Sequence, residues 1–172
     1  VALAGVDGGG GPDAVVANYQ NQGNKVWLNN GSGSFTDSGQ NLGSYQSRGV
    51  ELADLDGDGD LDAFVANHSS QGNKVWLNDG TGSFTDSGQS LGSYQSNDVK
   101  LADFDGDGDL DAFVSNYNQG NRVWLNDGSG SFTDSGQELR VSSSYDNSWG
   151  VDLADLDADG DIDAYVANYN EN

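Results

Sequence analysis

The chain has 172 residues, enough for one domain, and its 28 acidic and 6 basic residues give a formal net charge of −22. A field of that sign repels nucleic acid and anionic membranes, which excludes both as partners. The absence of cysteine excludes a disulfide framework, a thiol nucleophile and a cysteine-ligated zinc site, and no apolar run approaches the length of a membrane span.

The chain is organised by an internal repeat. Trp27, Trp76 and Trp124 are separated by 49 and 48 residues, and Asp54 and Asp103 are also 49 residues apart. We therefore divide the chain into three repeats and a partial fourth one, which cover residues 1–49, 50–98, 99–150 and 151–172.

Each full repeat contains four short runs of strand-forming residues, and no stretch has the pattern of an amphipathic helix. In the second repeat these runs cover residues 50–53, 63–67, 74–78 and 83–86. Four strands in a repeat of this length are typical of a β-propeller blade. The predicted fold is all-β: a single β-propeller segment of four-stranded antiparallel blades, with three full blades and a final hairpin that forms half a blade.

An acidic loop joins the first two runs of the second repeat. Asp54, Asp56 and Asp58 occupy loop positions one, three and five, and Asp62 at position nine can close a ligand shell. Asp60 stands at position seven, where a backbone carbonyl usually serves as the ligand. Carboxylates at alternate positions repel one another unless a cation lies among them, and calcium accepts six to eight such oxygen ligands. The loop therefore predicts a calcium site.

Two other calcium-binding motifs do not fit this loop. An EF-hand needs a glutamate at position twelve and a helix after it, whereas Val65 stands there within a short apolar strand. A nonapeptide β-roll needs its motif in immediate tandem, whereas this loop recurs after dozens of residues. The remaining alternative is a solvated acidic turn, which three near-identical copies disfavour.

The loop D-x-D-x-D-G-x-x-D, followed by N-(K/R)-V-W-L-N, resembles the FG-GAP or VCBS repeat. This is the calcium-loop blade of integrin α-subunit propellers, of many bacterial surface proteins and of fungal lectins. The resemblance covers essentially the whole chain and implies about three calcium ions, with backbone carbonyls at position seven as ligands. The ligands it implies in the third and fourth repeats are Asp103, Asp105, Asp107, Asp109 and Asp111, and Asp155, Asp157, Asp159, Asp161 and Asp163.

The first repeat departs from the acidic pattern. Gly5 and Gly9 replace the first and third carboxylates, and only Asp7 and Asp13 remain. We expect this loop to bind calcium weakly or not at all.

The number of blades has a consequence for assembly. A closed propeller needs at least four blades, and the family usually has seven. We therefore expect this chain to be either part of a larger repeat chain or a homo-oligomer that closes, or extends, with further copies.

Loops that differ between the repeats lie together on one face of the predicted propeller, opposite the calcium loops. Such variable loops on a rigid scaffold are where binding residues concentrate. Their aromatic and amide side chains suit a sugar, because rings stack on its apolar face and amides pair with its hydroxyl groups. The alternative is that these loops only cap the blades. The candidate ligand-binding residues are Tyr19, His68 and Tyr117 in one set of loops, and Arg48 and Trp149 at one equivalent position, which Asn97 also occupies.

Two further predictions concern the tryptophans of the repeats and the histidine, and one further observation concerns a loop. Trp27, Trp76 and Trp124, flanked by Val and Leu, are predicted to pack between blades. His68, the single histidine, is predicted to be a surface loop residue, because one histidine without partners makes neither a metal site nor a catalytic triad. The loop before Trp149 is three residues longer than its counterparts.

These features favour a calcium-binding extracellular β-propeller module for cell adhesion or carbohydrate binding, with a glycan or a surface protein as its partner. The alternative is a structural scaffold that assembles into a ring or a filament without a small ligand. We expect no enzyme, because the carboxylates are used by metal and no nucleophile, base and acid recur together. Val1 is not a natural initiator, so we expect a processed or trimmed N-terminus. The resemblance to extracellular calcium propellers implies a secreted or cell-surface protein.

Overall fold

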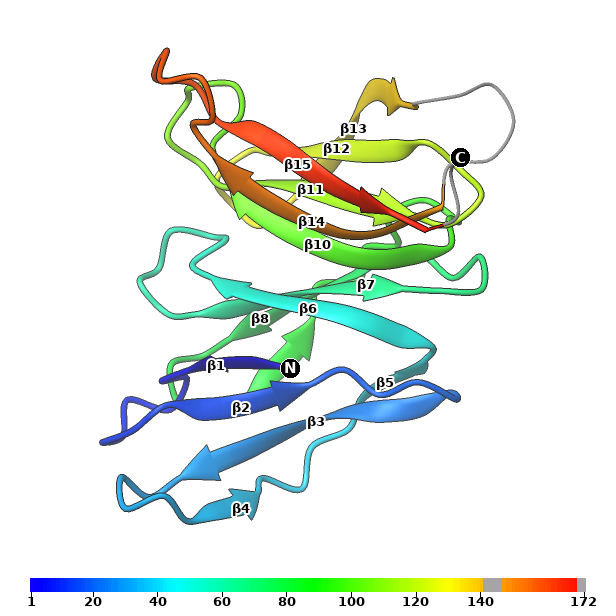
Figure 1. The fold of residues 1–172 in the computed structure, drawn as a ribbon. Coiled ribbons are helices and arrows are strands. Elements are labelled where there is room, and N and C mark those ends of the chain that lie inside the picture. The colour runs from blue at the N-terminus through cyan, green and yellow to red at the C-terminus, as the bar shows by residue number, and fades with distance from the viewer. Residues whose placement is uncertain (141–146, 170–172) are drawn as a thin grey trace.

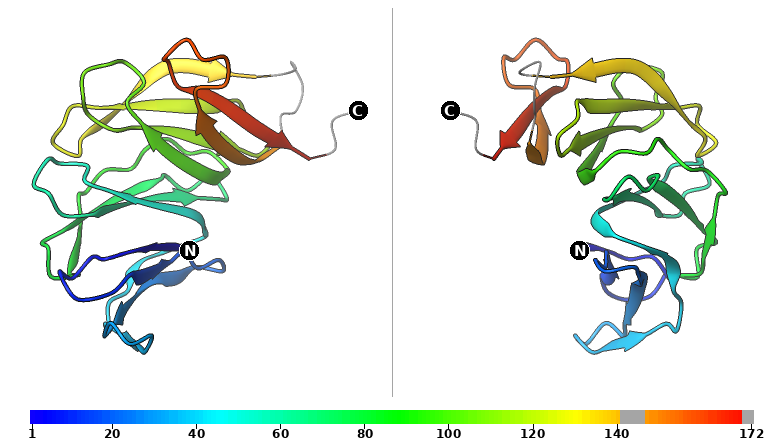
Figure 2. Two further views of the ribbon diagram at one scale, coloured as in Figure 1. Left: turned by 60° about the vertical axis from the view of Figure 1, so that its left-hand side comes forward. Right: turned by 90° about the vertical axis from the view of Figure 1, so that its right-hand side faces the viewer.

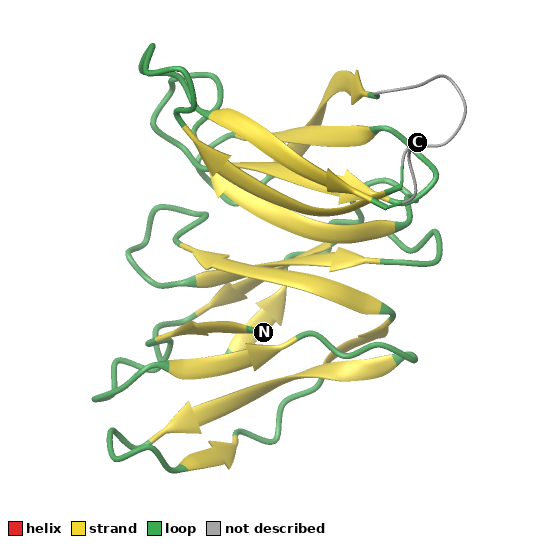
Figure 3. Cartoon of the chain, in the orientation of Figure 1, coloured by secondary structure: helices red, strands yellow, loops and turns green. Residues whose placement is uncertain are grey.

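The computed structural model describes residues 1–140 and 147–169, and every regular element within them is a β-strand (Figure 3). Three sheets of four or five strands and one two-stranded hairpin follow one another along the chain, and all their strands pair antiparallel. This confirms the predicted all-β propeller architecture, with three full blades and half of a fourth. The part of the chain that the structure describes includes no helix that could cross a membrane.

The strands follow the predicted repeats closely. The first blade contains β1 (Ala2–Ala4), β2 (Asp13–Val16), β3 (Gln22–Asn29) and β4 (Phe35–Asp37), with β5 (Leu42–Tyr45) paired to β3. The second contains β6 (Ser47–Ala53), β7 (Asp62–Asn67), β8 (Lys74–Asn78) and β9 (Phe84–Asp86). The third contains β10 (Ser96–Ala102), β11 (Asp111–Asn116), β12 (Asn121–Asn126) and β13 (Phe132–Leu139), and the half blade contains β14 (Ser148–Ala154) and β15 (Asp163–Asn168).

Two details differ from the sequence prediction. Strand β6 begins three residues earlier than expected, because Ser47 pairs with Asn67 beyond a bulge in the ladder. Strand β5 was not predicted, and it extends the sheet of the first blade by pairing with the start of β3. The first difference lengthens a strand by three residues, and the second adds a strand to the first blade.

The blades are stacked in chain order, with the first strands of successive blades side by side (Figures 1 and 2). The apolar core lies between the blades. Trp76 of the second blade shares one buried core with Val15 of the first, and Trp124 of the third blade shares another with Phe64 of the second. The prediction of packing between blades is therefore confirmed for Trp76 and Trp124, whereas Trp27 is only half-buried and belongs to none of the described core clusters.

Glutamine side chains also connect neighbouring blades. The Gln89 amide donates to the carbonyl oxygen of Gly130 at 2.7 Å, and its oxygen accepts the backbone N–H of Phe132 at 2.8 Å. Gln40 of the first blade makes the same two bonds to the second blade, also at 2.7 and 2.8 Å. Each glutamine therefore satisfies one backbone donor and one acceptor of the next blade and links the two blades.

Candidate functional site

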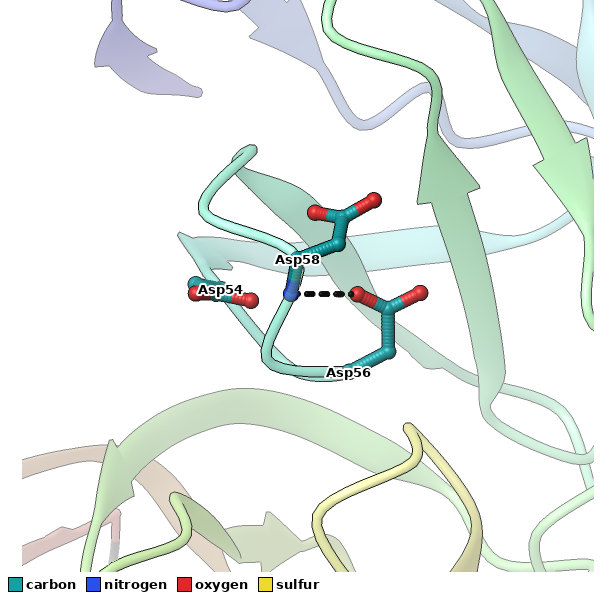
Figure 4. A group of neighbouring side chains, drawn as sticks. All are labelled: Asp54, Asp56 and Asp58. Carbon is teal, nitrogen blue, oxygen red and sulfur yellow. Dashed lines mark hydrogen bonds between the residues drawn. The ribbon is translucent and has the colours of Figure 1, made fainter.

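Each of the three acidic loops brings carboxylates close enough to share one cation. In the second blade, Asp54, Asp56 and Asp58 each offer an oxygen within 4.8 Å of the others (Figure 4). Carboxylate oxygens are the ligands that calcium prefers, so the donor set fits that ion. The corresponding groups in the next two loops are Asp103, Asp105 and Asp111, and Asp155, Asp157 and Asp163.

Backbone N–H groups hold the loop around these carboxylates. The Asp54 carboxylate accepts the N–H groups of Gly57 and Gly59 at 2.8 and 3.0 Å. The Asp58 N–H donates to the Asp56 carboxylate at 3.2 Å, the bond drawn in Figure 4. Gly59 has a φ of 93°, which a side chain at this position would oppose. The loop is thus shaped by the same carboxylates that would bind the ion.

The aspartate at position nine also has a structural role. Asp62 is buried, and its two oxygens accept the N–H groups of Leu55 at 3.0 Å and Asn78 at 2.8 Å. Asp13 makes the equivalent two bonds in the first repeat, at 2.8 and 2.7 Å, although that loop lacks the other carboxylates. This position therefore ties the loop to the third strand of its blade in addition to its predicted role as a calcium ligand.

The carboxylate at position seven is accommodated by a glycine in the neighbouring hairpin turn. A Cβ at Gly80 would lie 2.4 Å from an Asp60 oxygen, and a Cβ at Gly128 would lie 2.5 Å from an Asp109 oxygen. Both glycines also have positive φ angles, 76° and 78°. Packing of these carboxylates against the turns accounts for the glycine in the Asn-Asp-Gly motif of the second and third blades.

Protons should compete with calcium for the second loop. Burial, the largest cause, raises the pKa of Asp62 to about 6, and burial also raises the pKa of Asp111. In the calcium-free protein, the raised pKa of Asp62 contributes stability that is fully present below pH 3.8, the pKa of this group in the unfolded chain. That contribution is lost as the pH rises through about 6 and Asp62 loses its proton. Calcium must displace that proton, so its affinity, measured by calorimetry, should fall as the pH is lowered from about 7 to about 5. Equal affinities at both pH values would contradict this prediction.

The five predicted ligand-binding residues lie together at the opposite end of the blades. The guanidinium carbon of Arg48 lies 5.1 Å from the ring centre of Tyr19 and 5.3 Å from that of Trp149. The His68 ring lies 6.1 Å from the Tyr19 ring and 6.2 Å from the Tyr117 ring. Residues from all four blades thus form one group of aromatic rings around a single arginine.

Tyr169 completes this group, although sequence reasoning did not select it. Its ring lies 6.0 Å from that of Trp149. Tyr169 follows Asn168 as Tyr19 follows Asn18, and comparing the partial repeat with the first one could have found it. We refer to Tyr19, Arg48, His68, Tyr117, Trp149 and Tyr169 as the aromatic cluster.

Two adjoining pockets open within the aromatic cluster, and Arg48 and Trp149 line both. The larger has a volume of about 580 Å³ and the smaller about 290 Å³, together a suitable size for a small ligand. The larger pocket is lined by Ala17, Tyr19, Ser47, Arg48, Asn97, Asp98 and Trp149. The smaller is lined by Arg48, His68, Tyr117, Trp149 and Tyr169.

In the second blade and in the half blade, a serine–asparagine hydrogen bond lies next to two members of the cluster. The Ser47 hydroxyl donates to the Asn67 side-chain oxygen at 2.7 Å. Ser47 directly precedes Arg48 in the sequence, and Asn67 directly precedes His68. The pairs Ser96–Asn116, at 2.9 Å, and Ser148–Asn168, at 2.8 Å, are equivalent. Because these bonds join the first and second strands of a blade, the cluster rests on a rigid frame.

The equivalent residues Arg48, Asn97 and Trp149 are side by side on β6, β10 and β14. Arg48 donates to the Asn97 side-chain oxygen at 2.6 Å, and the Asn97 amide donates to the Ser148 carbonyl at 2.6 Å. The amide of Asn97 is thereby oriented with its oxygen toward Arg48. These bonds link the first strands of three blades.

The prediction that His68 is a surface residue is wrong. Its exposed fraction is only 9%, because the rings of Tyr19 and Tyr117 lie on either side of it. Burial, followed by the positive charge of Arg48, lowers the pKa of His68, so its imidazole is neutral at neutral pH. The longer loop predicted before Trp149 falls on residues 141–146 and lies outside the described residues.

Comparison with known proteins agrees with this architecture. A family model described as an FG-GAP-like repeat matches residues 6–65, 54–114 and 103–166. Among solved structures, a lectin of Agrocybe aegerita is 25% identical over 95% of this chain, with a TM-score of 0.57. This chain spans 45% of the length of that lectin, whose structure was described as the basis of its specific recognition of non-reducing terminal N-acetylglucosamine. A search of curated proteins gave no match.

Proposed function

Since the chain belongs to the FG-GAP-like repeat family, we propose that it is a calcium-stabilised β-propeller module that binds carbohydrate through its aromatic cluster. The observation that carries this proposal is the convergence of Tyr19, Arg48, His68, Tyr117 and Trp149 around two adjoining pockets. Binding without catalysis suits this cluster, whose histidine is buried and neutral.

The chemistry of the cluster matches that of a sugar. Tyr19, Trp149 and Tyr169 are all exposed, so their rings are open to stack on the apolar face of a pyranose. The phenolic hydroxyl groups and the guanidinium provide hydrogen-bonding partners for the sugar hydroxyl groups. The similarity to a lectin that recognises N-acetylglucosamine supports carbohydrate as the ligand class.

Calcium has a separate role in this proposal. The acidic loops join the end of the first strand of a blade to the start of the second, whereas Arg48 and His68 lie at the other ends of β6 and β7. Bound calcium would neutralise the carboxylates and hold each loop closed, but it would not touch the sugar. We propose an extracellular location, where calcium is abundant enough to fill sites that bind the ion at roughly 10⁻⁴ to 10⁻³ M.

Substitution of Trp149 tests the proposed sugar site. A glycan array probed in the presence of calcium should identify ligands, and Trp149→Ala should weaken their binding by about tenfold or more, because a stacking ring is lost. The bound calcium should remain unchanged. Arg140→Ala is the control, since it removes an exposed side chain of the third blade that is paired with Glu138 and lies outside the cluster. An array without any bound glycan, or equal losses in both variants, would reject the proposal.

A self-assembling scaffold is the second candidate function, and one observation favours it. Leu156 and Tyr165 of the half blade have exposed fractions of 61% and 69%. Their counterparts in the second blade, Leu55 and Phe64, are 1% and 0% exposed, because the third blade covers them. The half blade thus presents the same apolar face that a following blade covers elsewhere in this chain.

A further inference from the structure

Arg48 is exceptional among the basic residues of this acidic chain. The structure describes all six of them, and five have a carboxylate oxygen within 4.0 Å. Arg48 has no such partner among the described residues, although the chain contains 28 acidic side chains. The five paired residues are Lys25, Lys74, Lys100, Arg122 and Arg140.

The guanidinium of Arg48 is nevertheless held in place. It lies over the rings of Tyr19 and Trp149, and one of its nitrogens donates to Asn97 at 2.6 Å. A guanidinium has five N–H donors, and this is its one side-chain bond within residues 1–140 and 147–169. A stacked guanidinium with unused donors is preorganised to bind a planar anion.

The two pockets of the cluster differ in charge. Asp98 lines the larger pocket, where its carboxylate accepts the N–H groups of Val99 at 3.0 Å and Val151 at 3.3 Å. The smaller pocket is lined by Arg48, His68 and three aromatic residues, without an acidic side chain among them. His68 is neutral there, because burial and the charge of Arg48 lower its pKa. Among residues 1–140 and 147–169, Arg48 is thus the one charged group that lines the smaller pocket.

We propose that the smaller pocket binds the carboxylate of an acidic sugar, with Arg48 as its anchor and Trp149 as the platform for the sugar ring. This inference rests on the proposed carbohydrate-binding function and specifies the class of sugar. A carboxylate can accept two parallel N–H bonds from one guanidinium, which a neutral hydroxyl group cannot do. The pocket volume of about 290 Å³ suits a single sugar residue.

The net charge of −22 does not oppose this binding at close range. At physiological ionic strength, exposed charges are screened over about 8 Å, so the nearest groups determine the local potential. In the smaller pocket the nearest charge is that of Arg48. Asp98 lines the larger pocket instead, which would direct a ligand carboxylate toward the side of His68, Tyr117 and Tyr169.

Calorimetric titration of the calcium-loaded protein with charged and uncharged sugars tests the proposal. Carboxylates occur on uronic acids and on sialic acids, so the probes are methyl glucuronide and the methyl glycoside of N-acetylneuraminic acid, each beside its methyl ester. At least one acid should bind about tenfold or more tightly than its ester, because the ester cannot form the charged pair. If neither acid is preferred over its ester, the assignment of Arg48 is overturned.

Arg48→Gln should abolish the preference for the acid, so that the dissociation constants of the acid and its ester become about equal. Arg140→Gln is a matched control, because it makes the same change in net charge at an arginine paired with Glu138 outside the cluster. Arg48→Lys, which keeps the charge but loses the planar fork, should retain only part of the preference and provides a second variant if Arg48→Gln does not fold. A preference that persists in both Arg48 variants would overturn the proposal.

Failure of this inference can be distinguished from failure of the proposed function. If neutral glycans bind in a Trp149-dependent manner but acid and ester bind equally, carbohydrate binding stands and the role of Arg48 is refuted. If neither the four probes nor any glycan on an array binds, both are refuted.

Discussion

Removal of calcium with EDTA should lower the melting temperature of this protein by roughly 8–16 °C. With free calcium at ten times the dissociation constant, each site stabilises the fold by about 1.4 kcal/mol, and three sites by about 4 kcal/mol. In a chain of this size, 1 kcal/mol corresponds to about 2–4 °C. Without the ion, the clustered carboxylates of each loop repel one another. Differential scanning calorimetry with and without EDTA measures the shift.

Two aspartate substitutions provide the internal comparison. Asp107→Ala should reduce the bound calcium by one ion per chain, because Asp107 occupies position five of the third loop. Asp7→Ala should leave the calcium content unchanged, because Gly5 and Gly9 replace two of the ligands in the first loop. Atomic absorption on the dialysed proteins gives the stoichiometry. A melting curve that EDTA does not change would reject a structural role for calcium.

Light scattering in the presence of calcium should give a mass of at least twice the 18.0 kDa of one chain. The half blade exposes Leu156 and Tyr165, and the first blade exposes Phe35. The counterparts of Phe35 in the next two blades, Phe84 and Phe132, are buried between blades. Contact between the half blade of one copy and the first blade of another would cover both apolar faces.

Polar substitutions on the half blade should dissociate these assemblies. The double variant Leu156→Ser with Tyr165→Ser should scatter as a single chain, because it removes the largest exposed apolar side chains of that face. Tyr19→Ser is a control, since Tyr19 is also exposed but belongs to the aromatic cluster. A monodisperse wild-type species near 18.0 kDa would contradict self-association.

The fold could be predicted because its signals are local and repeated. The 49-residue spacing of Trp27 and Trp76 reflects one blade, and the acidic loop and the Asn-Asp-Gly turn mark the two hairpins within it. Comparing repeats also identified five residues of the aromatic cluster, since equivalent positions of neighbouring blades lie side by side.

The features that the sequence did not reveal depend on contacts between blades. Gln40 and Gln89 recur in the same D-S-G-Q motif, but they bond to backbone groups more than 40 residues away. A backbone partner cannot be recognised from residue types. His68 is buried by rings that belong to the blades on either side. Asp13 accepts two backbone N–H groups, and an aspartate with this structural role looks the same in the sequence as an aspartate that binds calcium.

The proposal that the aromatic cluster binds carbohydrate is tested most directly by a crystal structure of the calcium-loaded protein with a sugar selected on a glycan array. We expect the sugar ring to lie against Trp149, in the pockets that Trp149 and Arg48 share. The acidic loops should hold calcium and make no contact with the sugar. A sugar bound at the calcium-loop end of the blades, with these pockets empty, would contradict the proposal.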